Sequence, residues 1–213
     1  MENTISDMRK NYSLQELLES NCKENPFEQF SIWFEDARNS SILEANAMSL
    51  STADKQGKVS SRIVLLKNFT SDGFIFFSNY ESQKAKDLNE NPFASLLFFW
   101  DSLERQIRIE GLIEKISTSE SETYFLSRPI ESQLGAHASM QSSIVKNRDE
   151  LENKFAELKT QYEGKKIPMP KDWGGYKLIP DRFEFWQGRK SRLHDRIEYT
   201  IQNKIWNKVR LSP

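Results

Sequence analysis

The sequence predicts a mainly β fold with flanking helices (α+β), built around a closed or nearly closed antiparallel barrel. At least six short runs of β-favouring residues occur, separated by turn signals such as Asp54-Lys-Gln-Gly57 and Ser71-Asp-Gly73. Helical patterns interrupt these strands only at the front and in the middle of the chain. No internal repeat or low-complexity tract is present. We therefore expect one domain over residues 1–213, with residues 1–12 as a mobile N-terminal segment.

Composition restricts the classes of function. The 213 residues carry a net charge of −1, so no global field attracts nucleic acid or an anionic membrane. A single cysteine, Cys22, excludes an intramolecular disulfide, and two histidines make a protein-built zinc site improbable, so we expect no metal. The start of the chain lacks a signal-peptide pattern, and no apolar run is long enough to span a membrane. These features predict a soluble, cytoplasmic protein.

Two helices are expected near the N-terminus. Ser13 has the residue type of an N-cap and precedes Leu14, Leu17 and Leu18, which would share one helix face. Asn25-Pro-Phe-Glu28 combines a cap, a first-turn proline and a capping-box acid. The aromatic side chains expected to face inward from this second helix are Phe27, Phe30, Trp33 and Phe34.

The pattern then changes to the period of strands. Runs at 47–53 and 59–67 predict a hairpin, and a further strand at 74–77 is followed by a short polar helix at 82–89. The run 93–100 is almost continuously apolar, which predicts a strand buried on both faces. A long strand over 104–116 would place Gln106, Arg108 and Glu110 on one face, where Gln106 is either a groove residue or a solvent-facing one.

The second half of the chain predicts helices followed by strands. Ser119 is expected to cap a helix over 119–127, and Pro129 ends that helix or begins another. An amphipathic helix is expected over 147–161, and a proline-containing linker leads to the last strands. These strands are predicted at 175–179, 183–187, 192–202 and 204–211.

Positive side chains cluster near the C-terminus. If the chain from Lys190 is extended, Lys190, Arg192, His194 and Arg196 project from one face of a strand, with Leu193 and Ile197 on the other. Like charges on one face repel unless an anion lies among them, and a phosphate would suit. The alternative is a solvated edge strand whose cations discourage edge pairing.

Three further groups have the chemistry of anion sites. Arg62 and Lys67 bracket an apolar strand at opposite parity, so we expect them to serve two different ligands, unless they only flank a buried strand as gatekeeper charges. Ser78 and Lys84 lie at a strand-to-helix junction, where free backbone N–H groups can bind an anion. The third group recurs every four residues and would form a phosphomonoester site if the bend at Pro129 allows it, although each member alone is more often structural: Tyr124, Arg128 and Ser132.

The order Glu184-Phe-Trp, then Arg192-Leu-His-Asp-Arg196, closely resembles the C-terminal signature of pyridoxine (pyridoxamine) 5′-phosphate oxidases, the FMN enzymes that make pyridoxal 5′-phosphate. The run 124–142 also resembles that family, and the similarity extends from the Arg9 region to Arg210-Leu-Ser-Pro213. The resemblance implies an FMN-binding split β-barrel that forms a homodimer with FMN at the subunit interface. It also implies a short N-terminal stretch, with Arg9 and Tyr12, that can fold over the active site.

The resemblance also assigns roles to residues. Arg192 and His194 would face the pyridine ring as the catalytic pair. The residues implied to bind substrate are Arg9, Tyr12, Lys67, Tyr124, Arg128, Ser132, Arg192 and His194. Those implied to bind FMN are Arg62, Ile63, Val64, Leu65, Leu66, Lys67, Phe77, Ser78, Gln83, Lys84, Gln106, Gln141, Ser142, Trp186 and Arg196. Many family members carry a cation where this chain has Gln83, so its contact with FMN is carried over only weakly. His137 has no implied role and is expected to be a packing or surface residue.

The implied activity is FMN-dependent oxidation of pyridoxamine 5′-phosphate and pyridoxine 5′-phosphate to pyridoxal 5′-phosphate in vitamin B6 metabolism. O2 would be the acceptor, with H2O2 as product and ammonia released from the amine. Three alternatives are another split-barrel flavoenzyme such as a flavin reductase, a nucleic-acid-binding barrel, and a hydrolase using His194 and Asp195. No Gly-x-Ser-x-Gly, Gly-x-Gly-x-x-Gly or phosphate-loop signature is present.

Overall fold

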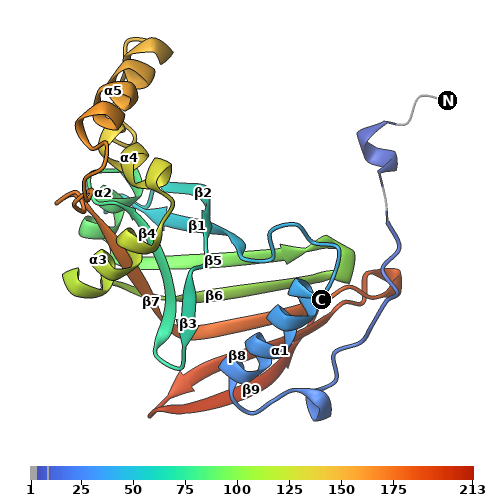
Figure 1. Cartoon of the computed structure of the whole chain (residues 1–213). Coiled ribbons are helices and arrows are strands. Elements are labelled where there is room, and N and C mark those ends of the chain that lie inside the picture. The colour runs from blue at the N-terminus through green and yellow to red at the C-terminus, as the bar shows by residue number, and fades with distance from the viewer. Residues whose placement is uncertain (1–3, 9) are drawn as a thin grey trace. The chain divides into compact units, whose positions relative to one another are not determined.

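The computed structural model describes residues 4–8 and 10–213, and Figure 1 shows its helices and strands. The chain divides into two compact units, each assembled from segments that are distant in sequence. Unit 1 comprises Met1–Ser49, Ser95–Gly111 and Pro180–Pro213, and unit 2 comprises Leu50–Ala94 and Leu112–Ile179. The expectation of a single domain over 1–213 stays a prediction, as does the mobility of residues 1–12.

Among the described residues, nine strands pair into one sheet with the order β2-β1-β5-β6-β7-β4-β3, and β8 and β9 extend from β7. The mainly antiparallel α+β architecture predicted from the sequence is confirmed. The strands are β1 (Ala47–Ala53), β2 (Val59–Leu65), β3 (Asn68–Thr70), β4 (Gly73–Asn79), β5 (Phe93–Trp100), β6 (Arg105–Lys115), β7 (Trp173–Gln187), β8 (Asp195–Gln202) and β9 (Ile205–Leu211).

In unit 1, helix α1 (Pro26–Arg38) packs its aromatic side chains on the sheet. Asn25 caps the helix by accepting a hydrogen bond from the Phe27 N–H, as predicted. Phe30 is fully buried against Phe98, and Trp33 packs edge-on against Phe185. These aromatic pairs form the core of unit 1 and fix α1 on the sheet.

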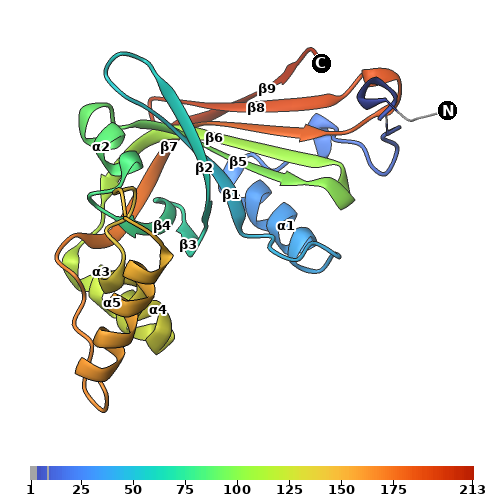
Figure 2. The same cartoon turned by 90° about the horizontal axis from the view of Figure 1, so that it is seen from above.

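The C-terminal strands of unit 1 form an antiparallel hairpin. Trp186 pairs with Arg196 between β7 and β8, and Ile201 pairs with Trp206 between β8 and β9. Figure 2 shows β8 and β9 side by side. The connecting residues Asn203 and Lys204 both have positive φ, the geometry of a tight two-residue hairpin turn.

Unit 2 combines strands with four helices. Strand β4 pairs with the first half of β7, from Phe74 opposite Leu178 to Asn79 opposite Trp173. The helices are α2 (Gln83–Glu90), α3 (Thr118–Ser127), α4 (Ile130–Ala138) and α5 (Arg148–Gln161). Phe125, Leu134 and Trp173 form a buried cluster that holds α3 and α4 beside β7.

The short helix predicted after Ser13 is wrong. Residues 13–18 are not helical, and a single 3-10 turn, Glu19–Asn21, follows them. The N–H groups of Ser13 and Leu14 donate instead to the Glu104 carboxylate, at 2.7 and 3.0 Å. A carboxylate from elsewhere in the sequence thus takes the donors that a first helical turn would leave free.

Several strand predictions also need correction. Strand β5 is buried on one face only, since Phe93 and Phe99 are more than half exposed. Strand β7 continues through Pro180 where two separate strands were predicted. The short strand β3 was not predicted.

The helix boundaries of unit 2 differ slightly from the predictions. The cap of α3 is Ser117, which forms a capping box with Glu120, rather than Ser119. Pro129 begins α4, the second of the two options left open. Asn147 caps α5, but no α5 residue is fully buried.

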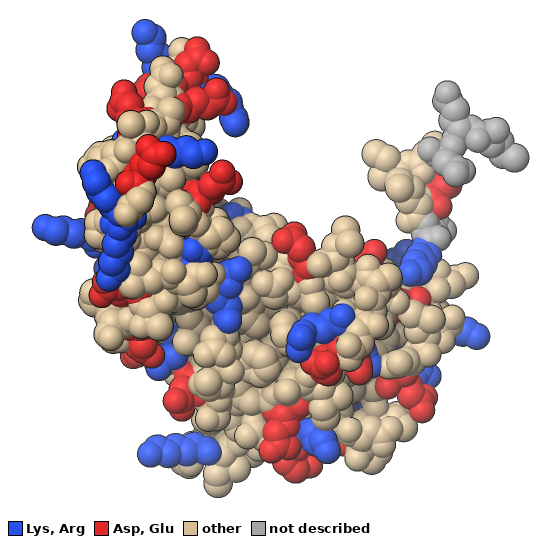
Figure 3. All heavy atoms as spheres, viewed as in Figure 1, with Lys and Arg blue, Asp and Glu red and all other residues tan. Residues whose placement is uncertain are grey.

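Surface charge is mixed. On the face shown in Figure 3, basic and acidic side chains are interspersed, so no region of one sign dominates that face. Among the described residues, no helix combines the length and apolar character needed to cross a membrane.

Candidate active site

A cavity with a volume of about 860 Å³ lies in unit 2. This volume lies in the range of pockets that take small molecules or cofactors. Strands β2 and β4, the start of α2, the α3–α4 junction and the loop after α4 contribute its walls. Predicted site residues that line it are Arg62, Ile63, Val64, Leu65, Lys67, Phe77, Ser78, Gln83, Lys84, Tyr124, Arg128, Ser132, Gln141 and Ser142.

Lys84 is the buried cation of this cavity. Its ammonium donates to Ser78 Oγ at 3.0 Å, Ser82 Oγ at 3.1 Å and Gln141 Oε1 at 2.9 Å. Burial, and then the charge of Arg62, lowers the pKa of Lys84 to about 8, although Asp87 acts in the opposite direction. A buried ammonium with only neutral hydrogen-bond partners is suited to receive an anion.

Arg62 of β2 is held by residues of the neighbouring strand β1 and by Asp87 of α2. Its guanidinium donates to the Leu50 carbonyl and to Thr52 Oγ1, and it lies 3.8 Å from Asp87. Asp87 is buried and also accepts from the Gln83 amide at 2.8 Å. The Gln83 side chain is therefore committed to Asp87, while the Gln83 backbone N–H donates to Ser142 Oγ.

A second group of donors surrounds Arg128, the C-cap of α3. The guanidinium lies 4.8 Å from the Trp173 ring centroid, and burial lowers the pKa of Arg128. Its Nη1 is buried and has no hydrogen-bond partner among the described residues, 4–8 and 10–213. Since buried donors are almost always satisfied, this atom is a position at which a ligand acceptor is expected.

Tyr124 and Ser132 lie beside Arg128 on the cavity wall. Tyr124 stacks on Phe77 with ring centroids 3.9 Å apart, and Ser132 lies in α4 just beyond Pro129. The four-residue spacing therefore brings the three side chains to one cavity, because two short helices meet at the proline.

Lys67 and Arg62 share this cavity in spite of their opposite parity. Strand β2 ends at Leu65, and the Lys67 N–H bonds to the Ile75 carbonyl outside the regular strand. The chain leaves the regular strand before Lys67, so both cations line one cavity, and the expectation that they serve two different ligands stays a prediction. Leu66 is buried and does not line the cavity.

Unit 1 holds the remaining predicted residues. The Trp186 and His194 rings lie 4.7 Å apart, and Tyr12 packs edge-on against both. Gln106 lies on the half-buried face of β6 with Arg108 and Glu110, which confirms their shared parity. Arg9 lies outside the described residues.

The predicted row of cations on one strand face is wrong for its first half. Lys190–Arg192 forms a 3-10 turn in which Ser191 and Arg192 have positive φ, and β8 begins only at Asp195. Arg192 and Leu193 are exposed. A tight turn, rather than an extended strand, presents Arg192 and His194.

The carboxylate of Glu184 pairs with Arg196 and Arg108, two cations for which the sequence alone indicated no partner. Arg196 donates to it through Nε and Nη2, at 2.9 and 3.0 Å, and Arg108 donates at 2.8 Å. Burial acts to raise the pKa of Glu184, but the hydrogen bond from Arg196 and the surrounding arginine charges outweigh it and lower the pKa. Arg196 is thereby fixed in orientation before any ligand binds.

Several residues that support the site could not be identified from the sequence alone. Trp173 supports Arg128, and Asp87 and Glu184 hold predicted cations, but no sequence signal pairs these distant charges. His137 was predicted to be a packing or surface residue, and its Nε2 lies 2.7 Å from the Pro168 carbonyl beside Phe125.

Comparison with known proteins places these features in context. Residues 34–162 match the family model described as pyridoxamine 5′-phosphate oxidase. Residues 173–213 match that of the pyridoxine 5′-phosphate oxidase C-terminal dimerisation region.

Relatives that match almost the whole of this chain include several named pyridoxine/pyridoxamine 5′-phosphate oxidase. The protein of Gloeothece citriformis is 49% identical over 100% of both chains. That of Leptospira biflexa is 52% identical, covering 99% of this chain and 100% of the relative. A chloroplastic relative from Arabidopsis thaliana is 53% identical over 98% of this chain but only 40% of its own length.

Solved structures show the same fold. PhzG from Burkholderia lata, solved in complex with tetrahydrophenazine-1-carboxylic acid, has a TM-score of 0.89 and 29% identity, covering 94% of this chain and 100% of PhzG. A pyridoxamine 5′-phosphate oxidase-related, FMN-binding protein from Nostoc punctiforme has a TM-score of 0.71 and 15% identity, covering 88% and 98% of the two chains.

Proposed function

Because the chain belongs to the pyridoxine/pyridoxamine 5′-phosphate oxidase family, we propose that it oxidises pyridoxamine 5′-phosphate and pyridoxine 5′-phosphate to pyridoxal 5′-phosphate. FMN is the cofactor and O2 the acceptor, and the products include H2O2 and, from the amine, ammonia. The activity belongs to vitamin B6 metabolism, and the cytoplasmic location expected from the sequence stays a prediction.

One observation carries the proposal most directly. A single cavity is lined by two sets of phosphate-type donors, Lys84 with its hydroxyl and amide neighbours, and Arg128 with Tyr124 and Ser132. The reaction needs sites for two phosphorylated molecules, the cofactor and the substrate. Among the residues that the structure describes, no carboxylate lies at hydrogen-bond distance from either set, which supports anion binding by both.

The residues around Lys84 fit the phosphate of FMN. We assign Arg62, Ser78, Lys84, Gln141 and Ser142 to the cofactor, and bound FMN supplies the hydride-accepting ring. Lys84 and Arg62 neutralise phosphate charge, while the apolar side chains of Ile63 and Val64 offer a wall for a flat ring.

The residues around Arg128 fit the substrate phosphate. Arg128 offers a planar fork of N–H donors, Tyr124 and Ser132 offer hydroxyls, and Lys67 adds a second charge. This phosphate is remote from the reacting carbon, so its contacts contribute affinity for the substrate in the ground state and the transition state alike.

Arg192 and His194 orient the substrate ring in this proposal. They lie in unit 1, within the region that matches the C-terminal dimerisation model, which supports a homodimer. We place FMN at the subunit interface, so that the Lys84 and Arg128 groups of one protomer are completed by Trp186, Arg192, His194 and Arg196 of its partner.

The absorption spectrum of the purified protein tests the cofactor, and a steady-state assay tests the substrate. We expect a yellow protein that forms pyridoxal 5′-phosphate and H2O2 from pyridoxamine 5′-phosphate. A colourless protein with salt-sensitive oligonucleotide binding would support the nucleic-acid-binding alternative. A flavoprotein that reduces free flavin but leaves both B6 phosphates unchanged would support a flavin reductase.

A further inference from the structure

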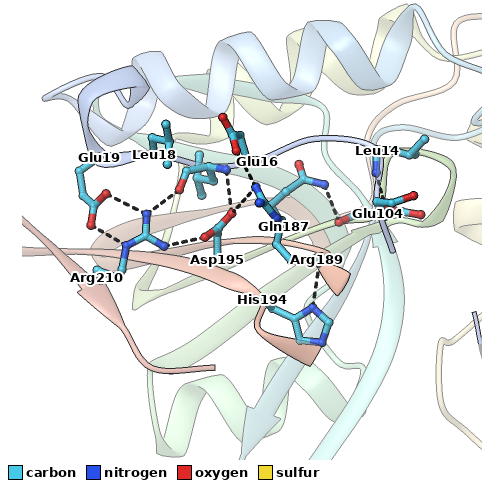
Figure 4. Close-up of polar contacts among 12 residues, drawn as sticks. Leu14, Glu16, Leu18, Glu19, Glu104, Gln187, Arg189, His194, Asp195 and Arg210 are labelled. Carbon is cyan, nitrogen blue, oxygen red and sulfur yellow. Dashed lines mark hydrogen bonds and ion pairs between the residues drawn. The ribbon is translucent and has the colours of Figure 1, made fainter. Parts of the chain in front are cut away.

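The turn that carries Arg192 and His194 is strained. Ser191 and Arg192 have φ values of 57° and 61°, a left-handed region that is energetically costly for residues other than glycine. Contacts outside the turn must offset this cost for the turn to keep one shape. Figure 4 shows that such contacts lie at its base, around Asp195.

Asp195 is a nearly buried carboxylate with both oxygens occupied. Oδ2 accepts from the Leu17 N–H at 3.0 Å and from Arg189 Nη1 at 3.3 Å, and Oδ1 accepts from Arg210 Nη1 at 2.7 Å. Its side chain is 14% exposed. Arg189 and Asp195 flank the turn, so their ion pair joins its two ends.

Two acidic residues that precede helix α1, Glu16 and Glu19, complete this network of ion pairs. Glu16 pairs with Arg189 at 3.0 Å, and Glu19 forms two hydrogen bonds with Arg210. Two arginines and three carboxylates therefore alternate in one continuous series of ion pairs, drawn in Figure 4. Each arginine lies between two carboxylates, which fixes its guanidinium in place.

The closed turn determines how His194 is presented. The Arg189 backbone N–H lies 3.1 Å from His194 Nδ1, so Nδ1 must be the acceptor and the ring hydrogen of neutral His194 lies on Nε2. A proton on Nδ1 would face another N–H. The bond therefore favours neutral imidazole with Nε2–H as its donor.

We propose that Asp195 is a positioning residue for the oxidation reaction, which closes the 189–195 turn through Arg189 and thereby holds His194 as a neutral Nε2–H donor. The expected effect on catalysis rests on the proposed function, whereas the expected effect on the His194 ring does not. Asp195 acts through the turn and touches neither cofactor nor substrate in this role.

Histidine NMR of the FMN-loaded enzyme tests the structural part. The chain contains only His137 and His194, so ¹⁵N-histidine labelling gives two imidazole rings, and His137 serves as internal reference. In the wild type, we expect His194 Nδ1 to show the shift of an unprotonated, hydrogen-bonded nitrogen. In Asp195→Asn, that signal should move toward the average of exchanging tautomers, while the His137 signals stay unchanged.

Kinetics test the functional part. We expect Asp195→Asn and Arg189→Met each to lower kcat/KM for pyridoxamine 5′-phosphate by about 10- to 100-fold with FMN still bound. The double variant should lose no more than the larger single loss, because both changes break one pair. Arg189→Lys, which keeps the charge, should recover most of the loss.

The matched control is Glu198→Gln on the same strand. Glu198 is 17% exposed and pairs with Arg182, so its loss removes a comparable ion pair away from the turn, and wild-type kinetics are expected. Unchanged His194 shifts and kinetics within twofold of wild type in Asp195→Asn would overturn the proposal, and if this variant does not fold, the same result in Arg189→Met would overturn it equally. A wild type inactive on both B6 phosphates would refute the proposed function alone, since the NMR result does not depend on turnover.

Discussion

At the residue scale, the buried Nη1 of Arg128, which has no partner among the described residues, makes the proposed substrate phosphate site testable. Replacing Arg128 by Met removes the guanidinium but keeps an apolar chain against Trp173. A hydrogen bond to a charged group contributes about 1.5–3 kcal/mol, so we expect kcat/KM for pyridoxamine 5′-phosphate to fall by about 10- to 150-fold. The loss should appear mainly in KM, because the phosphate is remote from the reacting carbon.

Arg148→Met is the control for this substitution. Arg148 lies in α5, is exposed and pairs with Glu152, so the variant should keep wild-type kinetics. The FMN absorption of Arg128→Met should also remain. An Arg128→Met enzyme with unchanged KM would remove Arg128 from the substrate site.

Lys84 predicts a pH dependence of cofactor affinity. Its pKa of about 8 means that the side chain is charged at pH 7 and largely neutral at pH 9. A phosphate with its second pKa near 6 keeps its charge over this interval, so only the protein loses attraction as pH rises. We expect FMN affinity of the apoprotein, measured by flavin fluorescence, to weaken above pH 8 by up to about tenfold per pH unit.

The Lys84→Met variant separates this effect from others. It should bind FMN more weakly at pH 7 and show little change between pH 7 and pH 9. If the wild-type affinity is also flat over this interval, Lys84 does not contact the cofactor phosphate as a cation.

At the element scale, the β8–β9 hairpin contains a suboptimal turn. Lys204 has a φ of 66°, where a side chain is strained and glycine is not. Glycine would relieve this backbone strain, which costs about 1–2 kcal/mol, but it would also increase the conformational entropy of the unfolded chain. We therefore expect Lys204→Gly to raise the free energy of unfolding by about 0.5–1 kcal/mol. Urea titration measures this change.

Lys204→Ala is the comparison that assigns the effect to the backbone. Alanine removes the charged side chain but keeps the Cβ atom, so this variant should not be stabilised. Equal stabilisation of both variants would mean that the lysine side chain, rather than the turn geometry, carries the cost.

Local sequence patterns predicted some helices and strands correctly and others wrongly. The α1 cap at Asn25, strand β1 and the alternation along β6 were predicted well, because each depends on residues close together in sequence. The helix after Ser13 failed because its donors bind Glu104, 90 residues away. Contacts of that range have no local signal.

The candidate site shows the same division. The Tyr124, Arg128 and Ser132 spacing identified part of one cavity wall, since two short helices preserve it across Pro129. The extended strand predicted from Lys190 failed, because Ser191 and Arg192 adopt positive φ that neither residue type indicates. Tertiary ion pairs around Asp195 supply the stabilisation that local propensity lacks.

At the scale of the whole molecule, the proposed interface site makes a prediction about mixed dimers. Arg128 lies in unit 2, and His194 lies in unit 1. If each active site takes unit-2 residues from one protomer and unit-1 residues from its partner, an Arg128→Met protomer and a His194→Asn protomer can complement each other. In a two-fold symmetric dimer, one site of the mixed species carries both substitutions and the other carries none.

Co-refolding the two impaired variants in equal amounts, with kcat/KM for pyridoxamine 5′-phosphate as the readout, tests this arrangement. Half of the dimers are then mixed and each has one intact site, so we expect about a quarter of wild-type activity with unchanged KM. If each site is built within one protomer, every site keeps one substitution, and activity stays at the level of the separate variants. Restored activity therefore requires residues from two chains at one flavin, whereas its absence from mixed dimers verified by differential tagging would place the whole site within one chain.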